Sequence, residues 1–325
     1  DFHEQSINSP YYFAPAAEPY HEVITKWQRE FQNGVGKNIA KNFDQNGWFY
    51  FTKEFFDLLY PSYGDTYPTF CGAIGMTYEQ GGSSSAGLGV INRNGDTLTL
   101  VDRIQHHHAA GLSTVEYAHL QSQKLITEFQ NFANNKNYKY KSFVVGGNPD
   151  RILALKKLLD GHNIAYSIGG GMNVKGFNYS TCSSGNMIAT ENHLVVSTNQ
   201  IKGTLVNVLF EPRTKLIDSL TYDITAWSLP YAYGLEAIAS EKLIPAFAQK
   251  VIPIKNNIPS GAYAYLCDWN SMKDAQFMTE LLQKGIRVRY AENPFVIAGK
   301  SYDRGTLIIA KGDNDSATFS KEVIE

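Results

Sequence analysis

The stretch Gly72-Ala-Ile-Gly-Met-Thr-Tyr-Glu-Gln-Gly-Gly82 has the pattern of a short apolar strand that ends on one carboxylate, Glu79, before two glycines. A charged group at a strand end is costly to bury unless it has a partner or a task. Glycines at this place let a backbone or a substrate come close. An exposed glutamate before a flexible loop explains the same residues, because functional carboxylates are a minority. Another segment has to decide between the two.

That segment is the start of the chain, Asp1-Phe-His-Glu-Gln5, in which His3 stands among acids and can bind a metal. Asn8-Ser-Pro-Tyr-Tyr-Phe-Ala-Pro15 follows shortly after it. Taken with the stretch Gly72 to Gln80, these segments resemble the carboxypeptidase A-like zinc metallopeptidase family. The resemblance is to its bacterial carboxypeptidase-related branch.

The resemblance implies a function and site residues. In that family a strand-end histidine is the third zinc ligand, and a glutamate on a later strand end is the general base that activates the zinc-bound water. These would be His3 and Glu79. A tyrosine in the loop before the glutamate strand closes over the peptide substrate, which implies Tyr60 or Tyr63, with Tyr60 slightly preferred. The implied protein is a secreted or periplasmic carboxypeptidase with Zn²⁺ as cofactor.

The sequence also departs from the family pattern. The first two zinc ligands of the family come from an H-x-x-E segment, and these 325 residues contain none. A catalytic zinc needs three protein ligands, so His3 alone cannot hold it tightly. We therefore expect a C-terminal part of a longer enzyme, inactive alone, with the other ligands upstream. The alternative is a non-enzymatic module that binds peptide or glycan in a degenerate peptidase cleft.

Composition gives broader limits. With 43% hydrophobic residues, 18% charged residues and a net charge of -2, the chain is typical of globular proteins and has no charge-based reason to bind nucleic acid. Its length favours two domains. No apolar run reaches membrane-spanning length, and Asp1 does not open a signal peptide. Cys71, Cys182 and Cys267 form no C-x-x-C pair, so neither a disulfide framework nor a structural zinc site is indicated.

Periodicity predicts the elements of the first half. A helix is expected from Tyr20 onward, because apolar residues recur at helical spacing through Val35. A short second helix is expected between Trp48 and Tyr60. The residues 80–89 should form a loop, either a mobile lid or a plain connector.

A second group of predictions covers the following segment. Asn94-Gly95 indicates a tight turn, with Asp96 or Thr97 capping a long helix that runs from Val101 to Phe132 and has a possible kink at Gly111. The run 106–108 contains three consecutive histidines. We expect a structural role for them, because metal ligands on a helix need positions three or four apart.

The polar segment 134–141 predicts a boundary between a domain at 1–137 and a domain at 138–325. Strands at 143–145 and 164–168 around a helix indicate a β-α-β unit with parallel strands, and 295–297 with 306–309 should close the chain as a hairpin. The predicted fold class is α/β: the C-terminal part of a mixed-sheet zinc-exopeptidase domain, followed by a flavodoxin-like domain.

The second half resembles class I glutamine amidotransferase-like domains. Active members need a nucleophilic cysteine on a strand-to-helix elbow with a histidine and a glutamate. Cys182 has no preceding apolar strand, and Cys267 lacks flanking glycines. The expected role of this domain is therefore non-catalytic, as a packing or substrate-shaping partner of the peptidase half.

Overall fold

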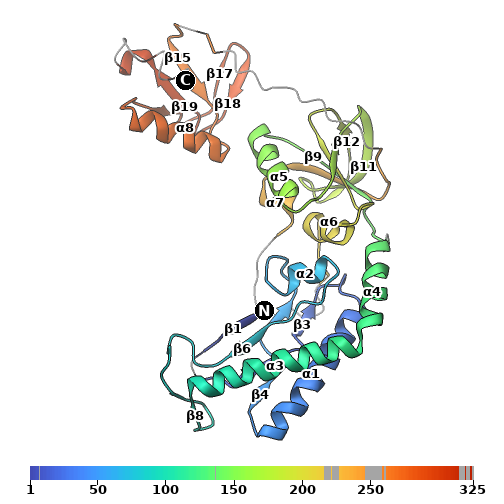
Figure 1. The fold of residues 1–325 in the computed structure, drawn as a ribbon. Coiled ribbons are helices and arrows are strands. Elements are labelled where there is room, and N and C mark those ends of the chain that lie inside the picture. The colour runs from blue at the N-terminus through green and yellow to red at the C-terminus, as the bar shows by residue number, and fades with distance from the viewer. Residues whose placement is uncertain are drawn as a thin grey trace. The chain divides into compact units, whose positions relative to one another are not determined.

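The chain is a mixed α/β protein with several sheets, as the sequence predicts (Figure 1). The computed structural model describes residues 1–6, 8–135, 137–215, 221, 227–245, 258–259, 261–314, 319 and 323. They divide into two compact units, one of residues 1–145 with 159–246 and the other of residues 146–158 with 247–325. The segment 134–141, where the sequence predicts a boundary, lies inside the first unit.

A four-stranded mixed sheet carries the N-terminal residues. Its order is β1 (Phe2–Glu4), β6 (Tyr78–Gln80), β2 (Tyr11–Tyr12) and β4 (Tyr50–Phe51). β1 runs parallel to β6, β2 antiparallel to β6, and β4 parallel to β2. Within residues 72–82 only Tyr78–Gln80 is strand, so Glu79 lies in the middle of a short strand and not at the end of a long one.

Helix α1 (Lys26–Asn46) supplies the core beneath this sheet. It begins later than predicted, because Ala17–Tyr20 forms β3 and pairs with β5 (Asp57–Leu58). Thr25 and Gln28 form a capping box, and Gly47 ends the helix at a φ of 68°. One apolar face of α1 is buried with aromatic residues of the sheet segment. The buried cluster comprises Tyr11, Phe13, Ala14, Phe31, Val35, Ile39, Phe43, Tyr78 and Ala110.

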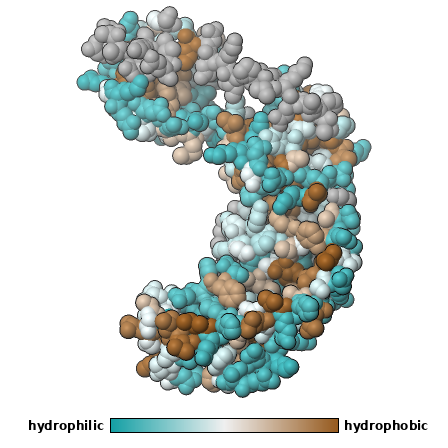
Figure 2. Space-filling view, in the orientation of Figure 1, coloured by the Kyte–Doolittle hydropathy of each residue, from teal (hydrophilic) through white to brown (hydrophobic). Residues whose placement is uncertain are grey.

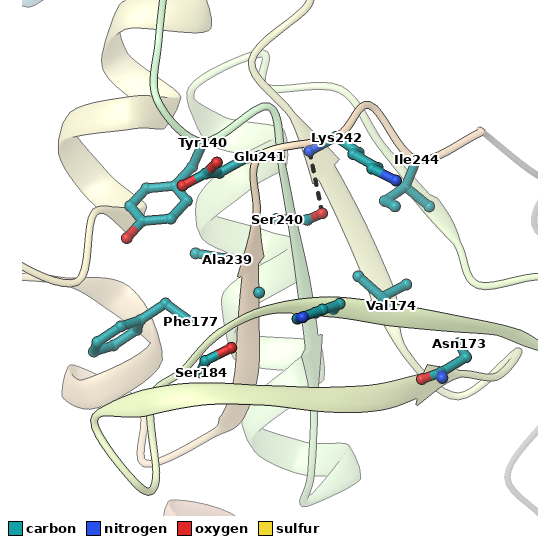
Figure 3. A pocket seen from close by; sticks show the side chains of 12 residues that line it. Tyr140, Asn173, Val174, Phe177, Ser184, Ala239, Ser240, Glu241, Lys242 and Ile244 are labelled. Atoms are coloured by element: carbon teal, nitrogen blue, oxygen red, sulfur yellow. Dashed lines mark hydrogen bonds between the residues drawn. The ribbon is translucent and has the colours of Figure 1, made fainter.

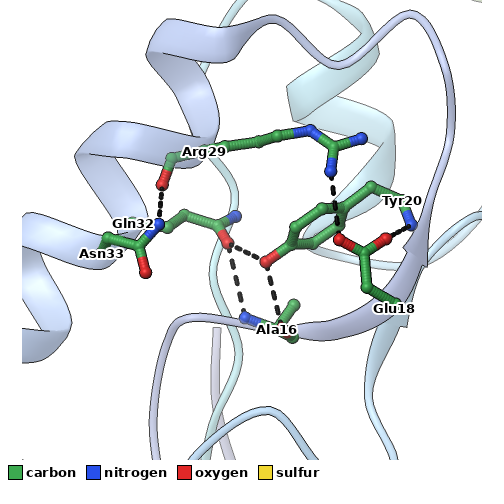
Figure 4. A network of polar contacts seen from close by, with 6 residues as sticks. All are labelled: Ala16, Glu18, Tyr20, Arg29, Gln32 and Asn33. Atoms are coloured by element: carbon green, nitrogen blue, oxygen red, sulfur yellow. Dashed lines mark hydrogen bonds and ion pairs between the residues drawn. The ribbon is translucent and has the colours of Figure 1, made fainter.

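Polar side chains fix β3 against α1 (Figure 4). The side-chain oxygen of Gln32 accepts from the Tyr20 hydroxyl at 3.3 Å and from the Ala16 backbone N–H at 3.5 Å. Glu18 accepts from the Tyr20 backbone N–H at 2.9 Å and pairs with Arg29 at 3.2 Å. The Arg29 guanidinium lies 4.3 Å from the centre of the Tyr20 ring. The segment before α1 is therefore positioned by the helix itself.

The predicted helix between Trp48 and Tyr60 is wrong. This segment forms β4 and β5, and positive φ angles at Lys53 and Phe55 are incompatible with a continuous helix. A short helix, α2 (Thr66–Phe70), follows. The Asn94–Gly95 turn is confirmed, because it joins β7 (Val90–Ile91) to β8 (Thr97–Leu98) in a hairpin.

The predicted long helix is two helices, α3 (Leu100–Leu120) and α4 (Ser122–Asn134), which break at Gln121 and not at Gly111. Thr99 caps α3, in place of Asp96 or Thr97. α3 packs against α1, and its outer face carries exposed apolar side chains, visible as brown atoms over this helix (Figure 2). These are Leu100, Val101, Ile104, Leu112, Val115 and Leu120. None of the helices in the described parts of the chain has the length and apolar character needed to cross a membrane.

A six-stranded sheet forms the rest of the first unit. Its order is β10 (Tyr166–Ile168), β13 (Leu194–Ser197), β9 (Ser142–Gly146), β14 (Glu236–Ser240), β11 (Met172–Asn178) and β12 (Ser183–Ala189). β13 lies between β9 and β10 and runs antiparallel to both. β9 and β10 therefore run in the same direction, as predicted for the β-α-β unit, but β13 lies between them. Helices α6 (Gly203–Phe210) and α7 (Leu229–Ala232) belong to the first unit, whereas most of α5 (Pro149–Gly161) belongs to the second.

The second unit contains a smaller antiparallel sheet, ordered β15 (Ala264–Cys267), β19 (Leu307–Ala310) and β16 (Arg289–Tyr290), with helix α8 (Met272–Gln283). A short 3-10 helix, η1 (Lys311–Asp313), follows β19. The predicted closing hairpin has the wrong partner. β17 (Phe295–Ile297) pairs with β18 (Lys300–Tyr302), whereas β19 is the central strand of the sheet.

The close approach of α1 to residue 14 gives a stability test. A Cβ atom on Gly36 would lie 2.3 Å from the Ala14 carbonyl oxygen, whereas a Cβ on Gly161 at the end of α5 meets open space. Gly36→Ala should lower the free energy of unfolding by about 1–3 kcal/mol through overpacking. Gly161→Ala should leave it unchanged or raise it by up to about 1 kcal/mol. Urea unfolding measures the free energy of unfolding of both variants. A Gly36→Ala variant as stable as Gly161→Ala would contradict the close approach of α1 to Ala14.

Candidate functional site

His3 and Glu79 lie directly opposite each other on neighbouring strands. The parallel pairing of β1 with β6 makes them register partners, and His3 Nδ1 lies 3.6 Å from Glu79 Oε1. The side chain of His3 is 62% exposed and that of Glu79 is 7% exposed. The sequence therefore identifies two residues that the fold brings into contact across 76 positions of chain.

Polar contacts on both strands hold this pair. The Gln5 backbone N–H donates to the Gln80 carbonyl at 2.9 Å, and the Gln5 side-chain amide donates to the carbonyls of Pro10 and Glu79 at 2.7 and 3.2 Å. The Gln80 side-chain oxygen lies 2.8 Å from His106 Nδ1. Gln80 and the backbone carbonyl of Glu79 are thus fixed, so the carboxylate is presented by a rigid piece of backbone.

Burial sets the electrostatics of this carboxylate. Burial raises the pKa of Glu79, while the nearby imidazole of His3 lowers it and the carboxylate of Asp65 raises it further. Burial also raises the pKa of Asp65, whereas a hydrogen bond of 2.8 Å from the Thr77 hydroxyl lowers it. Among the described residues the Glu79 carboxylate accepts no hydrogen bond, so it keeps its full capacity to accept a proton.

Both residues line one cavity of about 800 Å³. One part of its lining is aromatic, and much of the rest is polar, with carboxylates, two amides and a guanidinium. The lining residues other than His3 and Glu79 are Glu4, Gln5, Ser6, Ser9, Pro10, Phe49, Phe51, Glu54, Phe55, Phe56, Arg93 and Asn94. The sequence reasoning missed this aromatic set, although the cluster of phenylalanines at 49–56 was the visible signal for it.

Tyr60 and Tyr63 are not among the residues that line this cavity. Their rings contact each other at 5.4 Å between centres, and the Tyr60 ring lies 6.1 Å from that of Trp227. The fold therefore places the two tyrosines in an aromatic group of their own, and it does not bring either onto His3 or Glu79.

A buried arginine holds the loop that follows Glu79. The Arg103 side chain donates from Nη1 to the Gly82 carbonyl at 3.2 Å and from Nη2 to the carbonyls of Ala86 and Leu88 at 2.7 and 2.9 Å. Arg103 is only 4% exposed, and Nη1 also lies 3.9 Å from Glu4 on β1. The loop is therefore anchored at three carbonyls by one planar side chain.

The side chains of the described residues do not meet the needs of a zinc ion. A catalytic zinc takes three protein ligands and an open position. In the described parts of the chain, no three His, Cys, Asp or Glu side chains form a group that could hold a metal. His106 and His107 contact Gln80 and Tyr11 instead, at 2.8 Å each. The described residues thus supply His3 as a single candidate ligand and do not fit a complete zinc site.

A second cavity of about 490 Å³ lies on the six-stranded sheet (Figure 3). Strands β11 and β14 form its floor, with Tyr140 and Phe177 on one side and Lys242 and Ile244 on the other. The described residues that line it include no histidine or cysteine. It therefore offers neither a thiol nor an imidazole for catalysis.

The two cysteines of the second half have different surroundings. Cys182 is exposed in the turn between β11 and β12, and its Sγ lies 3.8 Å from the Tyr231 hydroxyl. Cys267 ends β15, and burial together with Asp274 raises its thiol pKa to about 12. No histidine is among the described hydrogen-bond partners of either thiol.

The raised pKa of Glu79 predicts a pH-dependent stability. Folding favours the protonated carboxyl of Glu79. Its contribution to the free energy of unfolding is therefore fully present below the pKa of the unfolded chain, about 4.3, and is lost as the pH rises through the pKa of the folded chain. Glu79→Gln cannot ionise. The variant should therefore gain stability relative to the parent chain as the pH rises from about 4 to about 7.

Asp102→Asn is the matched control for this titration. Hydrogen bonds from Thr99 lower the pKa of Asp102, so its contribution is already complete above about pH 4 and the difference from the parent should stay constant in that range. Urea unfolding across the range measures both. A constant difference for Glu79→Gln as well would contradict the raised pKa.

Comparison of the chain with protein-family models, curated proteins and solved structures gives no match in any of the three.

Proposed function

We propose that this chain is part of a zinc-dependent metallocarboxypeptidase that removes C-terminal residues from peptides, with Glu79 as general base and His3 as one zinc ligand. The observation that carries the proposal is the register of β1 and β6, which puts the two residues 3.6 Å apart at one cavity. Sequence resemblance selects the same pair. The enzyme is proposed to be secreted or periplasmic on the resemblance alone.

Glu79 has the properties that a general base requires. Its carboxylate is largely buried, it borders the cavity, and burial raises its pKa toward neutrality from the ordinary value. In the proposed reaction it takes a proton from the water that attacks the scissile carbonyl and later delivers a proton to the leaving amine. A pKa nearer the working pH serves both steps, because the group must accept and release the same proton.

The cavity supports a peptide as the substrate class. Phenylalanines 49, 51, 55 and 56 offer apolar surface for a side chain, while Arg93 offers a guanidinium that can pair with a carboxylate. In the proposal Tyr60 or Tyr63 contributes to substrate binding only if the loop 60–65 moves, since neither tyrosine lines the cavity.

Zinc enters the proposal as a group that would polarise the scissile carbonyl. The described residues do not complete its site. The proposal takes the missing ligands to lie in sequence outside this chain. Under the rival proposal, a non-enzymatic module, the same aromatic cavity binds peptide or glycan without hydrolysis.

For the second half we propose a non-catalytic role. The raised pKa of Cys267 keeps its thiol protonated and therefore weakly nucleophilic, and the described contacts of Cys182 include no base. The antiparallel pairings of β13 with β9 and β10 do not support the flavodoxin-like part of the resemblance, since flavodoxin-like sheets pair parallel strands. We retain only the packing or substrate-shaping role.

Glu79→Gln tests the proposed reaction in the full-length gene product. The variant should lose about 10²- to 10⁴-fold in turnover, because a glutamine cannot take the proton, while its zinc content stays unchanged. Release of the C-terminal residue from a free-acid peptide is the assay, and the same peptide with a C-terminal amide is the blank.

Glu30→Gln on the exposed face of α1 is the control and should keep normal turnover. Loss of zinc in Glu79→Gln would contradict its role as base. Peptide binding without hydrolysis by the unmodified full-length protein would favour the non-enzymatic module.

The second half is tested by replacing Cys182 and Cys267 together with serine in the same full-length protein. Peptide hydrolysis should stay within a few-fold of normal, because neither thiol is placed to act as a nucleophile. Glutamine-dependent release of ammonia is measured in parallel. Ammonia release that disappears in the double variant would contradict the non-catalytic role.

A further inference from the structure

A group of reactive side chains lies where α2 packs against α6, outside the lining of the His3–Glu79 cavity (Figure 1). It contains Tyr67, Cys71, His162 and Lys202. Lys202 Nζ lies 3.3 Å from Cys71 Sγ, and the Tyr67 hydroxyl lies 2.8 Å from His162 Nδ1. Neither the proposed reaction nor the core packing uses this combination of a thiol and an amine.

The two ends of this contact are held by separate helices. Cys71 is the residue that follows α2, and Lys202 is the residue that precedes α6. Both side chains are partly buried, and 131 positions of sequence separate them. Burial, and next the neighbouring thiol of Cys71, raise the pKa of Tyr67. The thiol is therefore surrounded by donors that the fold brings together.

We propose that Cys71 and Lys202 form an oxidation-dependent covalent crosslink, a sulfenamide between Sγ and Nζ, that ties the end of α2 to the start of α6. The oxidant is a peroxide from solution. The crosslink does not depend on the proposed peptidase activity, since none of the residues involved lines the His3–Glu79 cavity.

The chemistry takes two balanced steps. The Cys71 thiolate attacks one peroxide oxygen, so an S–O bond forms, the O–O bond breaks and the peroxide is reduced to hydroxide, leaving a sulfenic acid. The neutral Lys202 amine then attacks the sulfenic sulfur. An N–S bond forms, the S–O bond breaks, and the leaving hydroxide takes a proton from the nitrogen as water. The thiol and amine together lose two hydrogen atoms, and one peroxide becomes two waters.

Proximity selects this pair over the other thiols. Sulfenic acids condense with thiols or with nearby nitrogens, and at 3.3 Å the Lys202 amine is already in contact with the sulfur that must be attacked. Among the described contacts, neither Cys182 nor Cys267 has an amine as partner. These two cysteines can therefore be replaced without touching the proposed site.

The test uses the full chain with Cys182→Ser and Cys267→Ser, which leaves Cys71 as the one thiol. The chain is treated with hydrogen peroxide, alkylated and digested with trypsin. Trypsin does not cleave after a lysine whose amine is bonded. Residues 54–93 and 176–213 should therefore be recovered as one linked species, lighter by two hydrogen atoms than the sum of its parts and separated again by a thiol reductant.

Lys202→Arg in the same background is the matched control, because it keeps the positive charge and removes the amine. It should give no linked species, and Cys71 should proceed to sulfinic acid. If the background variant does not fold, the parent chain carries the same test, with the linkage assigned by fragmentation. An unlinked Cys71 with normal cleavage after Lys202, or a linked species that persists in Lys202→Arg, would overturn the proposal.

Discussion

The parallel pairing of β1 with β6 is the interaction on which the candidate site depends. It is only three residues long, yet its register alone places His3 opposite Glu79. Successive side chains of a strand point to opposite faces, so a slip by one residue would turn the imidazole away from the carboxylate. The Gln5 side chain opposes such a slip, because its amide donates hydrogen bonds to the carbonyls of Glu79 and Pro10.

Two buried amides of α1 then fix the approach to β6. The Gln28 side chain donates to the carbonyls of Thr69 and Ala73, and Gln32 donates to that of Gly75. The Thr69 carbonyl lies in α2, whereas those of Ala73 and Gly75 belong to the irregular segment between α2 and β6. A buried carbonyl left without its donor costs about 1–3 kcal/mol, so the helix determines where this segment and hence Glu79 can lie.

Local patterns in the sequence predicted what local physics determines. Helical spacing of apolar residues located α1, and Asn94–Gly95 located a hairpin. Strand partners were not predictable in this way, since a period of two is the same for a parallel and an antiparallel neighbour. This is why β13 between β9 and β10 was missed. The contact of His3 with Glu79 was predicted because a motif resemblance, and not periodicity, linked the two segments.

The surroundings of Glu79 differ from those of the other buried polar groups. Gln28, Gln32 and Arg103 use their donors on backbone carbonyls and thereby stabilise the fold. Glu79 is buried to a similar degree, but in the described part of the chain its carboxylate accepts no hydrogen bond and meets His3 only at 3.6 Å. Burying a carboxylate without such bonds opposes folding. Its position is therefore explained better by chemistry at the cavity than by a contribution to stability.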